Sequence, residues 1–172
     1  MWCNRSWRFS GACFGAHPFF KEHHMERATT AVFIGHRDCY ELTEEAIIPK
    51  IEEAITLGVT TFLNGGMGHF DHLCAEAVDR VKAQHPEIKQ VLIKPYDSLK
   101  VPFAYLFDDA GLYSLDWHIE HIGFRRAIPE RNEYMIQHSS VAICYVKHRS
   151  SGSYKTYQKA KDKGLKIVEV QD

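Results

Sequence analysis

Short apolar runs alternate with longer amphipathic segments along most of the chain. Five runs are rich in aliphatic, β-branched and aromatic residues: 31–35, 59–64, 88–94, 141–146 and 165–170. Short runs that are apolar throughout are typical of strands buried on both faces of a parallel sheet. Between the runs, apolar residues recur at helical spacing, most clearly at Phe70, Leu73, Cys74, Ala77, Val78 and Val81. The pattern therefore predicts strands and helices in alternation.

The predicted helices cover residues 43–58, about 70–81, 128–139 and 153–163. Thr43 suits a helix cap, and Gly58 and Gly164 suit helix ends. Pro129 suits a first turn, and Pro49 is expected to begin or kink its helix. Alternating strands and helices form parallel sheets with right-handed crossovers. We predict an α/β fold with a doubly wound, mainly parallel sheet of about five strands and flanking helices.

Two segments do not fit this alternation. Residues 1–28 show neither period and lack the apolar core of a signal peptide. We interpret them as a poorly ordered or loosely docked tail, or as an upstream extension of a chain that starts at Met25. Residues 97–127 are aromatic-rich and too long for an ordinary connection. We expect them to pack over one edge of the sheet, partly as helix, within a single domain of residues 29–172.

The composition narrows the class of protein. The 172 residues are 45% hydrophobic, which is enough for one domain with a substantial core. The net charge of -1 provides no overall basic field, so nucleic acid is disfavoured as a partner. No stretch approaches the roughly 20 apolar residues of a membrane span. The cysteines form no CxxC pair, which favours reduced thiols in a cytoplasmic protein.

Three loops leave the carboxyl ends of predicted strands, where ligands bind in doubly wound sheets: 35–42, 64–71 and 147–156. The second loop contains Gly65, Gly66, Met67 and Gly68 directly before a helix. Glycine permits positive φ and lets a phosphate approach backbone amides at a helix start. The loop is therefore a candidate phosphate site, although the same sequence also suits a tight turn without a ligand.

The third loop enters its helix through small and hydroxyl residues: Ser150, Ser151, Gly152, Ser153 and Thr156. Their hydroxyls and amides are candidates for the same anion. Arg37 follows the first strand and either binds phosphate through its forked guanidinium or makes a surface ion pair. Asp71 either complements a helix dipole or contacts a ribose hydroxyl. His36 is a candidate phosphate contact that titrates near neutral pH.

Three stretches occur in a recognisable order along the chain: Gly35, His36 and Arg37 with Glu41 and Leu42; Gly65, Gly66, Met67 and Gly68 with Asp71; and residues 131–146 followed by 151–156. Together they resemble the SLOG superfamily of Rossmann-like nucleotide-binding proteins, most closely its YpsA-like branch. The resemblance covers nearly all of residues 31–170. It implies a Rossmann-like sheet that binds a nucleotide or nucleotide-derived ligand, without a settled activity. It also makes Arg131 and Asn132 candidate ligand contacts.

The same superfamily includes LOG-type phosphoribohydrolases, which cleave the base from a nucleoside monophosphate. Arg131 and Met135 match their R-x-x-x-M motif, but Lys159 stands where their second motif has a glutamate. An N-glycosidic bond breaks through a cationic sugar, which a carboxylate stabilises and an ammonium opposes. Asp71 or Glu133 would have to take over this role, and the sequence places neither of them.

The superfamily also includes the DNA-processing protein DprA, which binds single-stranded DNA. Gly35-x-Arg37 and Gly152-Ser153-x-x-Thr156 resemble its pattern. The near-neutral charge of this chain counts against that function.

Histidine pairs at 69 and 72 and at 118 and 121 have the spacing of one helical face. No third ligand follows either pair at a recognisable interval, so we predict no metal site.

We therefore expect a nucleotide-binding or sensing module rather than an enzyme, with a small-molecule nucleotide as its ligand and no further cofactor. The phosphate is expected between residues 65–68 and 151–156, near Arg37 and Arg131. A nucleotide N-glycosidase and a single-stranded DNA-binding protein are the alternatives. Assembly into a homo-oligomer is left open.

Overall fold

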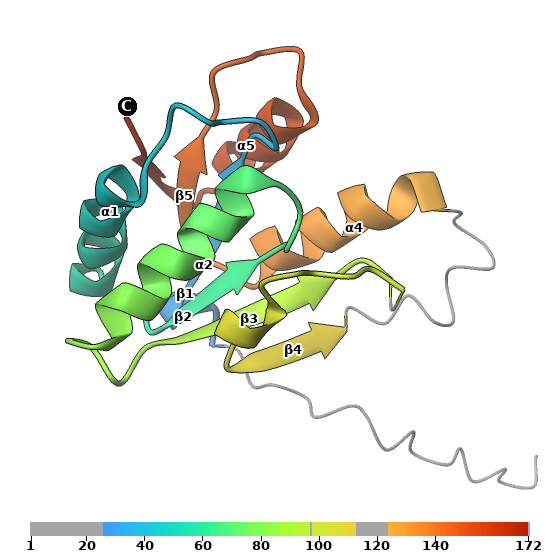
Figure 1. The fold of residues 1–172 in the computed structure, drawn as a ribbon. Helices are drawn as coiled ribbons and strands as arrows, with labels where there is room; N and C mark the ends of the chain where they lie inside the picture. Colours follow the sequence, from blue (N-terminus) through green and yellow to red (C-terminus); the bar gives the residue numbers. More distant parts are fainter. Residues whose placement is uncertain (1–25, 97, 113–123, 172) are drawn as a thin grey trace, which may run out of the picture.

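The computed structural model describes residues 26–96, 98–112 and 124–171, which form a six-stranded sheet (Figure 1). The strands lie in the order β4-β3-β2-β1-β5-β6, and each neighbouring pair is parallel. Their bounds are β1 Thr30–Gly35, β2 Thr61–Asn64, β3 Lys89–Lys94, β4 Asp109–Leu112, β5 Val141–Tyr145 and β6 Lys166–Glu169. The sheet confirms the predicted α/β fold class.

Helices cover both faces of the sheet (Figure 1). The bounds of the described helices are α1 Glu44–Thr56, α2 His69–Lys82, α4 Phe124–Gln137 and α5 Gly152–Asp162, with short 3-10 helices η1 Arg27–Thr29 and η2 Ala104–Leu106. Successive strand residues face opposite sides of a sheet. Phe33 accordingly packs in the core beneath α1 and α2, whereas Ile34 packs in the core beneath α4 and α5.

The direction of winding reverses at the middle of the sheet. From β1 the chain proceeds outward through β2, β3 and β4, and then returns through α4 to β5 on the other side of β1. β1 and β5 pair from Ala31 opposite Val141 to Gly35 opposite Tyr145, so their carboxyl ends lie side by side. Connections that leave two such ends diverge to opposite faces and open a crevice between them, where ligands of doubly wound sheets bind.

The segment 97–127 differs in part from the prediction. It contains the short helix η2, as expected of a partly helical segment, but it also contributes β4. This strand pairs with β3 from Val91 opposite Asp109 to Lys94 opposite Leu112 and so extends the sheet itself.

Two prolines lie inside helices. α4 begins at Phe124 rather than at residue 128, so Pro129 is internal, and α1 continues through Pro49. An internal proline removes one helical hydrogen bond. In α1, buried Ile47 and Ile51 pack on either side of the proline, which keeps the helix on the sheet.

Residues 1–25 and 113–123 lie outside the described residues. The expectations for most of the tail and for His118 and His121 fall within these two ranges. Where the description begins, Arg27 Nε donates a hydrogen bond to the carbonyl of Ser139 at 3.1 Å. Within the described part of the chain, no helix is both long and apolar enough to cross a membrane.

Candidate functional site

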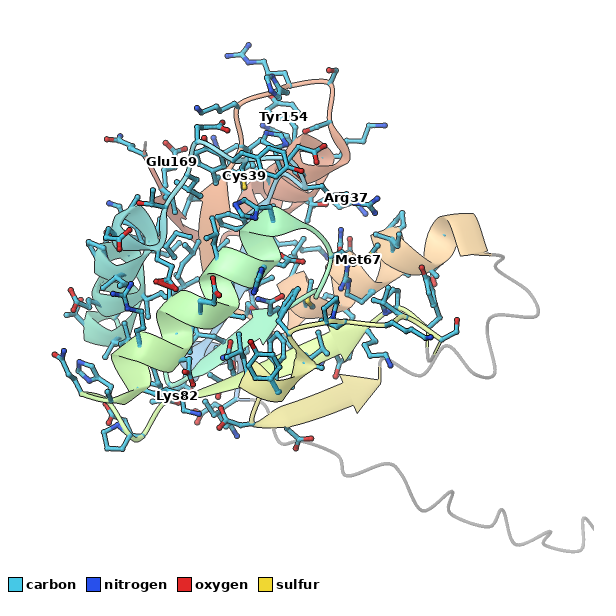
Figure 2. All side chains as sticks on the ribbon, viewed as in Figure 1. Arg37, Cys39, Met67, Lys82, Tyr154 and Glu169 are labelled. Carbon is cyan, nitrogen blue, oxygen red and sulfur yellow. The ribbon has the colours of Figure 1, made fainter. Side chains whose placement is uncertain are left out.

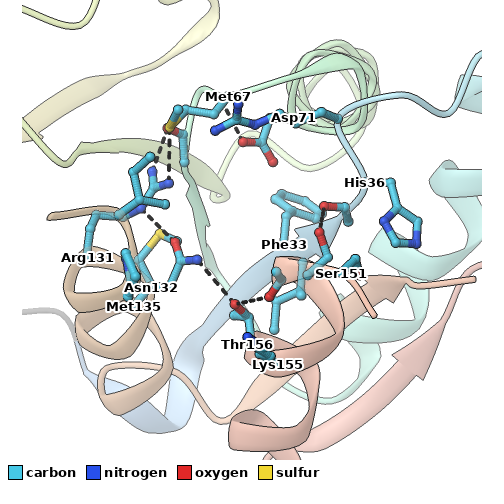
Figure 3. Close-up of a pocket in the computed structure, with 18 of the residues that line it drawn as sticks. Phe33, His36, Met67, Asp71, Arg131, Asn132, Met135, Ser151, Lys155 and Thr156 are labelled. Atoms are coloured by element: carbon cyan, nitrogen blue, oxygen red, sulfur yellow. Dashed lines mark hydrogen bonds between the residues drawn. The ribbon is translucent and has the colours of Figure 1, made fainter. Parts of the chain in front are cut away.

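A cavity of about 580 Å³ opens at the carboxyl ends of β1 and β5, between α4 and α5 (Figure 3). We call it the switch-point cavity. Its lining brings together all of the predicted binding residues except Gly66 and Gly68: Gly35, His36, Arg37, Gly65, Met67, Asp71, Arg131, Asn132, Ser151, Gly152, Ser153 and Thr156. Their convergence follows from the topology, because each of them follows a strand end or lies in α2, α4 or α5 next to one.

The glycines of the β2–α2 turn are needed for packing within the protein. A Cβ atom on Gly65 would lie 2.4 Å from Arg131 Nη1. Gly66 has φ +66°, and a Cβ atom there would lie 2.6 Å from Leu92 Cδ1. Gly68 has φ +107°, and its Cβ atom would lie 2.6 Å from the Arg37 Cα. Each glycine is therefore required by the fold, whether or not a ligand approaches the turn.

Two amides of this turn donate hydrogen bonds to neighbouring side chains. The N–H of Gly66 donates to Asn64 Oδ1 at 2.8 Å, and the N–H of Met67 donates to Asp71 Oδ2 at 2.7 Å. Asn64 Nδ2 in turn donates to the carbonyl of Asp71 at 2.7 Å. These bonds tie the turn to the first residues of α2 and occupy the amides of Gly66 and Met67.

Asp71 is the carboxylate that lines the cavity. Burial raises its pKa to about 6, although the Met67 amide and the charges of Arg131 and Arg37 act in the opposite direction. A carboxyl group with such a pKa exchanges a proton near neutral pH. It can therefore meet a ligand hydroxyl as an acceptor or as a donor.

Arg131 is 3% exposed, and its guanidinium donates hydrogen bonds mainly to other groups of the protein. Its Nη1 donates to the carbonyls of Gly65 at 2.6 Å and Ile93 at 2.8 Å, and its Nε donates to Asn132 Oδ1 at 2.9 Å. Nη2 contacts Met67 Sδ at 3.6 Å. Burial lowers the pKa of Arg131 to about 10. Its guanidinium thus joins α4 to the ends of β2 and β3 and supplies positive charge to the floor of the cavity.

His36 aligns the β5–α5 connection. Its Nε2 accepts hydrogen bonds from the amides of Lys147 at 2.8 Å and His148 at 3.2 Å. Acceptance at Nε2 requires a neutral ring. Burial, followed by the nearby His148, lowers the pKa of His36, which agrees with the neutral form.

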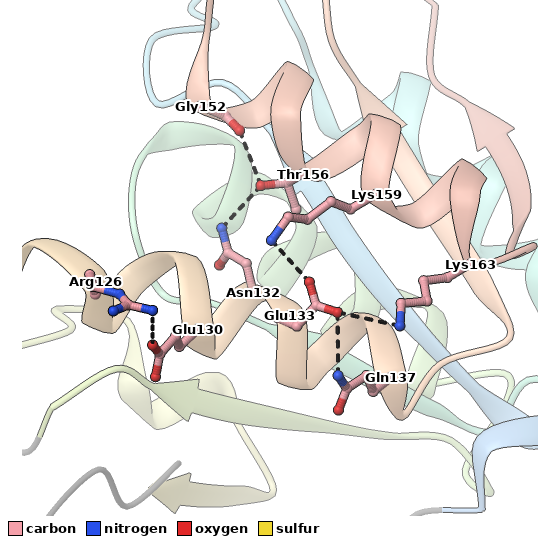
Figure 4. Close-up of polar contacts among 9 residues, drawn as sticks. All are labelled: Arg126, Glu130, Asn132, Glu133, Gln137, Gly152, Thr156, Lys159 and Lys163. Atoms are coloured by element: carbon pink, nitrogen blue, oxygen red, sulfur yellow. Dashed lines mark hydrogen bonds and ion pairs between the residues drawn. The ribbon is translucent and has the colours of Figure 1, made fainter. Parts of the chain in front are cut away.

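The hydroxyls of the β5–α5 turn are also bonded within the protein. Ser151 caps α5 by accepting from the Tyr154 amide at 3.0 Å. Ser153 Oγ donates to the Gly35 carbonyl at 2.5 Å. Thr156 Oγ1 donates to the Gly152 carbonyl at 3.1 Å and accepts from Asn132 Nδ2 at 3.2 Å (Figure 4). These bonds set the position of the helix start at the mouth of the cavity.

The start of α5 offers unused donors. Within the residues that the structure describes, the N–H groups of Gly152 and Ser153 have no hydrogen-bond acceptor. A Cβ atom on Gly152 would meet nothing within 4 Å, so the space before this helix end is open. The first amides of a helix carry partial positive charge and bind anions.

Two exposed cations line the same cavity as these amides. Arg37 and Lys155 line the cavity, are exposed, and make no ion pair or hydrogen bond through their side chains with any other described residue. Lys159 also lines the cavity, but its Nζ lies 3.0 Å from Glu133 Oε2 (Figure 4). Glu133 is not part of the lining, and the hydrogen bond from Lys159 lowers its pKa.

An apolar wall of the cavity was not predicted. Ile128 and Met135 of α4 line it on the same helical face as Arg131 and Asn132, and Phe33 of β1 is also among its lining residues. The spacing of Ile128, Arg131, Asn132 and Met135 on one helical face is the sequence signal that would have indicated this wall.

Within the described chain, no group of three or more His, Cys, Asp or Glu residues could hold a metal ion. His69 packs against Tyr40, with ring centroids 5.1 Å apart. His72 lies 3.3 Å from Glu76 and stacks on Phe103.

Neither the comparison with known protein families nor the comparison with curated proteins finds a match. Among solved structures, the chain is similar to DNA processing protein A from Helicobacter pylori, whose structure concerns its single-stranded DNA binding mode. The TM-score is 0.57 and the identity 15%, over 86% of this chain and 67% of that one. It is also similar to DNA processing protein A (DprA) from Streptococcus pneumoniae, with TM-score 0.58 and 14% identity over 86% of this chain and 52% of that one. At these identities, the likeness establishes a shared Rossmann-like fold.

Proposed function

We propose that the switch-point cavity binds a nucleotide, with its phosphate at the start of α5 between Arg37 and Lys155. The observation that carries this proposal is the pair of unbonded amides of Gly152 and Ser153 in a cavity that is also lined by Arg37 and Lys155, two exposed cations that form no salt bridge with a described residue. Helix amides, the helix dipole and flexible cations together form an effective phosphate site.

The remainder of the cavity suits a nucleoside. Its volume of about 580 Å³ lies within the range of roughly 300–1,000 Å³ that is usual for small-molecule sites. Ile128 and Met135 of α4 provide apolar surface for a base. Asp71 provides an acceptor for a ribose hydroxyl, as acidic residues do in related folds. The resemblance to the YpsA-like branch of the SLOG superfamily supports the same ligand class.

A binding or sensing role is favoured over hydrolysis. The position that holds glutamate in the hydrolases holds Lys159, whose charge is directed to Glu133 on α4. Hydrolysis of the N-glycosidic bond is the alternative, and Asp71 would have to stabilise the cationic sugar. Release of free base from AMP, followed by chromatography and abolished in Asp71→Asn, would support that alternative and overturn the binding role.

Isothermal titration with AMP, GMP, CMP and UMP, and with the corresponding nucleosides, tests the binding role. We expect at least one monophosphate to bind more than tenfold tighter than its nucleoside. Arg37→Ala and Lys155→Ala should each weaken monophosphate binding by about 10- to 150-fold, equivalent to roughly 1.5–3 kcal/mol for a charged hydrogen bond. Lys89→Ala, an exposed lysine at the opposite end of the strands, is the matched control. Equal affinity for nucleoside and monophosphate would refute the phosphate site.

Single-stranded DNA is the second candidate ligand. It is supported by the fold shared with the Helicobacter pylori protein, whose structure concerns single-stranded DNA binding. Binding of a labelled oligonucleotide that weakens steeply with salt would support it. The net charge of -1 requires that any such binding depend on a local basic surface rather than on the whole molecule.

A further inference from the structure

A second cavity of about 420 Å³ lies on the side of α5 that faces away from the switch-point cavity. We call it the β6-side cavity. Residues of α5 divide between the two cavities: Lys155, Thr156 and Lys159 line the first, whereas Tyr154, Tyr157, Gln158 and Lys161 line the second. In Figure 2, Tyr154 and Glu169 of this second region lie apart from Met67, which lines the first cavity. The start of α5 therefore stands between two hollows.

The aromatic side chains of the β6-side cavity are held in place. The rings of Tyr154 and Tyr157 stack with centroids 6.2 Å apart and planes at 29°. Lys161 Nζ lies 5.3 Å from the centroid of Tyr157, and the Tyr157 hydroxyl donates to Glu169 Oε1 at 2.8 Å. A fixed aromatic stack next to cations is the arrangement on which unpaired bases stack.

The charge of this cavity is predominantly positive. Lys147, Arg149 and Lys161 line it, against the single acid Glu169, which accepts the hydrogen bond from Tyr157. Lys147 Nζ also forms an ion pair with Glu41 Oε1, at 3.3 Å. Arg149 is exposed and forms no ion pair with any residue that the structure describes. The cavity therefore has the charge and the aromatic surface that a nucleotide of a single strand requires.

The connection between β5 and α5 lies between the two cavities. It carries Lys147 and Arg149 into the β6-side cavity and Ser151 into the switch-point cavity. A helix with its side chains is about 10–12 Å across. A ligand that occupies both hollows must therefore cross the helix start, past the unbonded amides of Gly152 and Ser153, which a single mononucleotide does not do.

We propose that the β6-side cavity holds a further nucleotide of a single-stranded oligonucleotide whose first nucleotide occupies the switch-point cavity. The proposal rests on the proposed nucleotide site. The strand crosses the β5–α5 turn, with a phosphate at the start of α5, Arg149 on the next phosphate, and a base added to the Tyr154–Tyr157 stack. Mononucleotides fill the first cavity alone.

The test compares thymidine monophosphate, by calorimetry, with fluorescein-labelled oligothymidylates of two to eight nucleotides, by fluorescence anisotropy. Oligothymidylate is expected to bind at least tenfold tighter than the monophosphate. Arg149→Ala and Tyr154→Leu should each lower oligothymidylate affinity about tenfold, in line with the usual contribution of one stacked base, and leave monophosphate affinity unchanged. Tyr154→Phe, which keeps the ring, should retain oligothymidylate affinity.

Matched controls are Lys89→Ala for the cation and Tyr105→Leu for the aromatic residue, since Tyr105 is 79% exposed and lines neither cavity. Circular dichroism of each variant checks the fold. Monophosphate binding without any gain for the oligothymidylate overturns this inference and leaves the proposed nucleotide site standing. Oligothymidylate affinity that is unchanged in both Arg149→Ala and Tyr154→Leu overturns it as well. Absence of binding of any monophosphate overturns the nucleotide site first.

Discussion

The two turns that begin helices at the switch-point cavity use small residues for different purposes. In the β2–α2 turn, each of Gly65, Gly66 and Gly68 faces protein atoms closer than a Cβ atom tolerates. In the β5–α5 turn, Gly152 faces open space. The first turn is glycine-rich because the protein packs tightly around it, and the second contains a glycine that the fold does not require.

The two turns also differ in the hydrogen bonds of their central amides. The Gly66 and Met67 amides of the first turn donate to Asn64 and Asp71, whereas those of Gly152 and Ser153 find no acceptor in the described chain. A count of glycines therefore does not by itself rank the two turns as anion sites. The useful criterion is which backbone donors remain after the protein has satisfied its own.

Removal of Arg131, which donates a hydrogen bond to the first turn, should have the largest effect on stability. Arg131→Ala leaves the carbonyls of Gly65 and Ile93 without their donor and removes one of the two positive charges near Asp71, the other being Arg37. We expect a loss of about 3–5 kcal/mol in the free energy of unfolding. Urea denaturation measures this loss. Arg37→Ala is the matched control, because Arg37 is exposed, and it should change stability by less than about 0.5 kcal/mol. Equal stability of the two variants would contradict the structural role of Arg131.

A branched side chain in each turn should separate them further. Gly66→Val must adopt a positive φ and meets Leu92 and Val101, so we expect a loss of about 2–4 kcal/mol. Gly152→Val has neither constraint in the helix start, and its stability should change by less than about 1 kcal/mol, while nucleotide binding falls because the side chain covers the free amides. Thermal denaturation and calorimetry of both variants test this pair. A larger stability loss for Gly152→Val than for Gly66→Val would reverse the distinction between the turns.

The sequence predicted the fold because its evidence is local. Buried strands and helical stripes repeat over a few residues, so the five predicted strands and the alternation of helices could be read directly. β4 was missed because Asp109–Leu112 has no strand pattern of its own, and its conformation follows from backbone pairing with β3. The start of α4 was placed too late because Pro129 was taken as a first-turn residue, although packing carries the helix through it.

The location of the candidate site could be predicted from the sequence, but the interactions of its individual side chains could not. Loops at the carboxyl ends of neighbouring strands must converge, which is why most of the predicted residues line one cavity. Arg131 was expected to hold a phosphate, yet its main partners are the carbonyls of Gly65 and Ile93, at 66 and 38 residues of separation. Nothing in a sequence reports how many donors of a side chain are already in use.

The carboxylate of the first turn should make stability depend on pH. Burial raises the pKa of Asp71 from 3.8 to about 6 in the folded chain. A raised folded pKa gives stability that is fully present below the unfolded pKa and is lost as the pH rises through about 6. Asp71→Asn keeps an acceptor for the Met67 amide and carries no charge. Its stability relative to the wild type should therefore increase by on the order of 1–2 kcal/mol between pH 4 and pH 7.5.

Melting curves at several pH values measure this difference, and Asp162→Asn, an exposed carboxyl at the end of α5, is the control. The lowered pKa of His36 has the opposite effect, because it reduces the stability of the protein as the pH falls. His36 is present in both proteins, so this effect cancels in their difference. A difference between Asp71→Asn and wild type that stays constant with pH would mean that the carboxyl does not titrate in this range.

The smallest expected effect concerns the second turn and its helix. Lys159 pairs with Glu133 across α4 and α5, and Lys163 lies 3.7 Å from the same carboxylate. Lys159→Glu restores the residue type of the hydrolase motif but places two carboxylates together, so we expect a stability loss of less than about 1 kcal/mol, because the pair is exposed and Lys163 remains. Lys159→Met, which removes the charge without the repulsion, is the matched control. Both proteins should release no free base from AMP above background over hours, because the new carboxylate would lie against Glu133 rather than against a sugar in the cavity. Base release by Lys159→Glu alone, detected by chromatography, would show that the second turn retains the geometry of a hydrolase and lacks only its carboxylate.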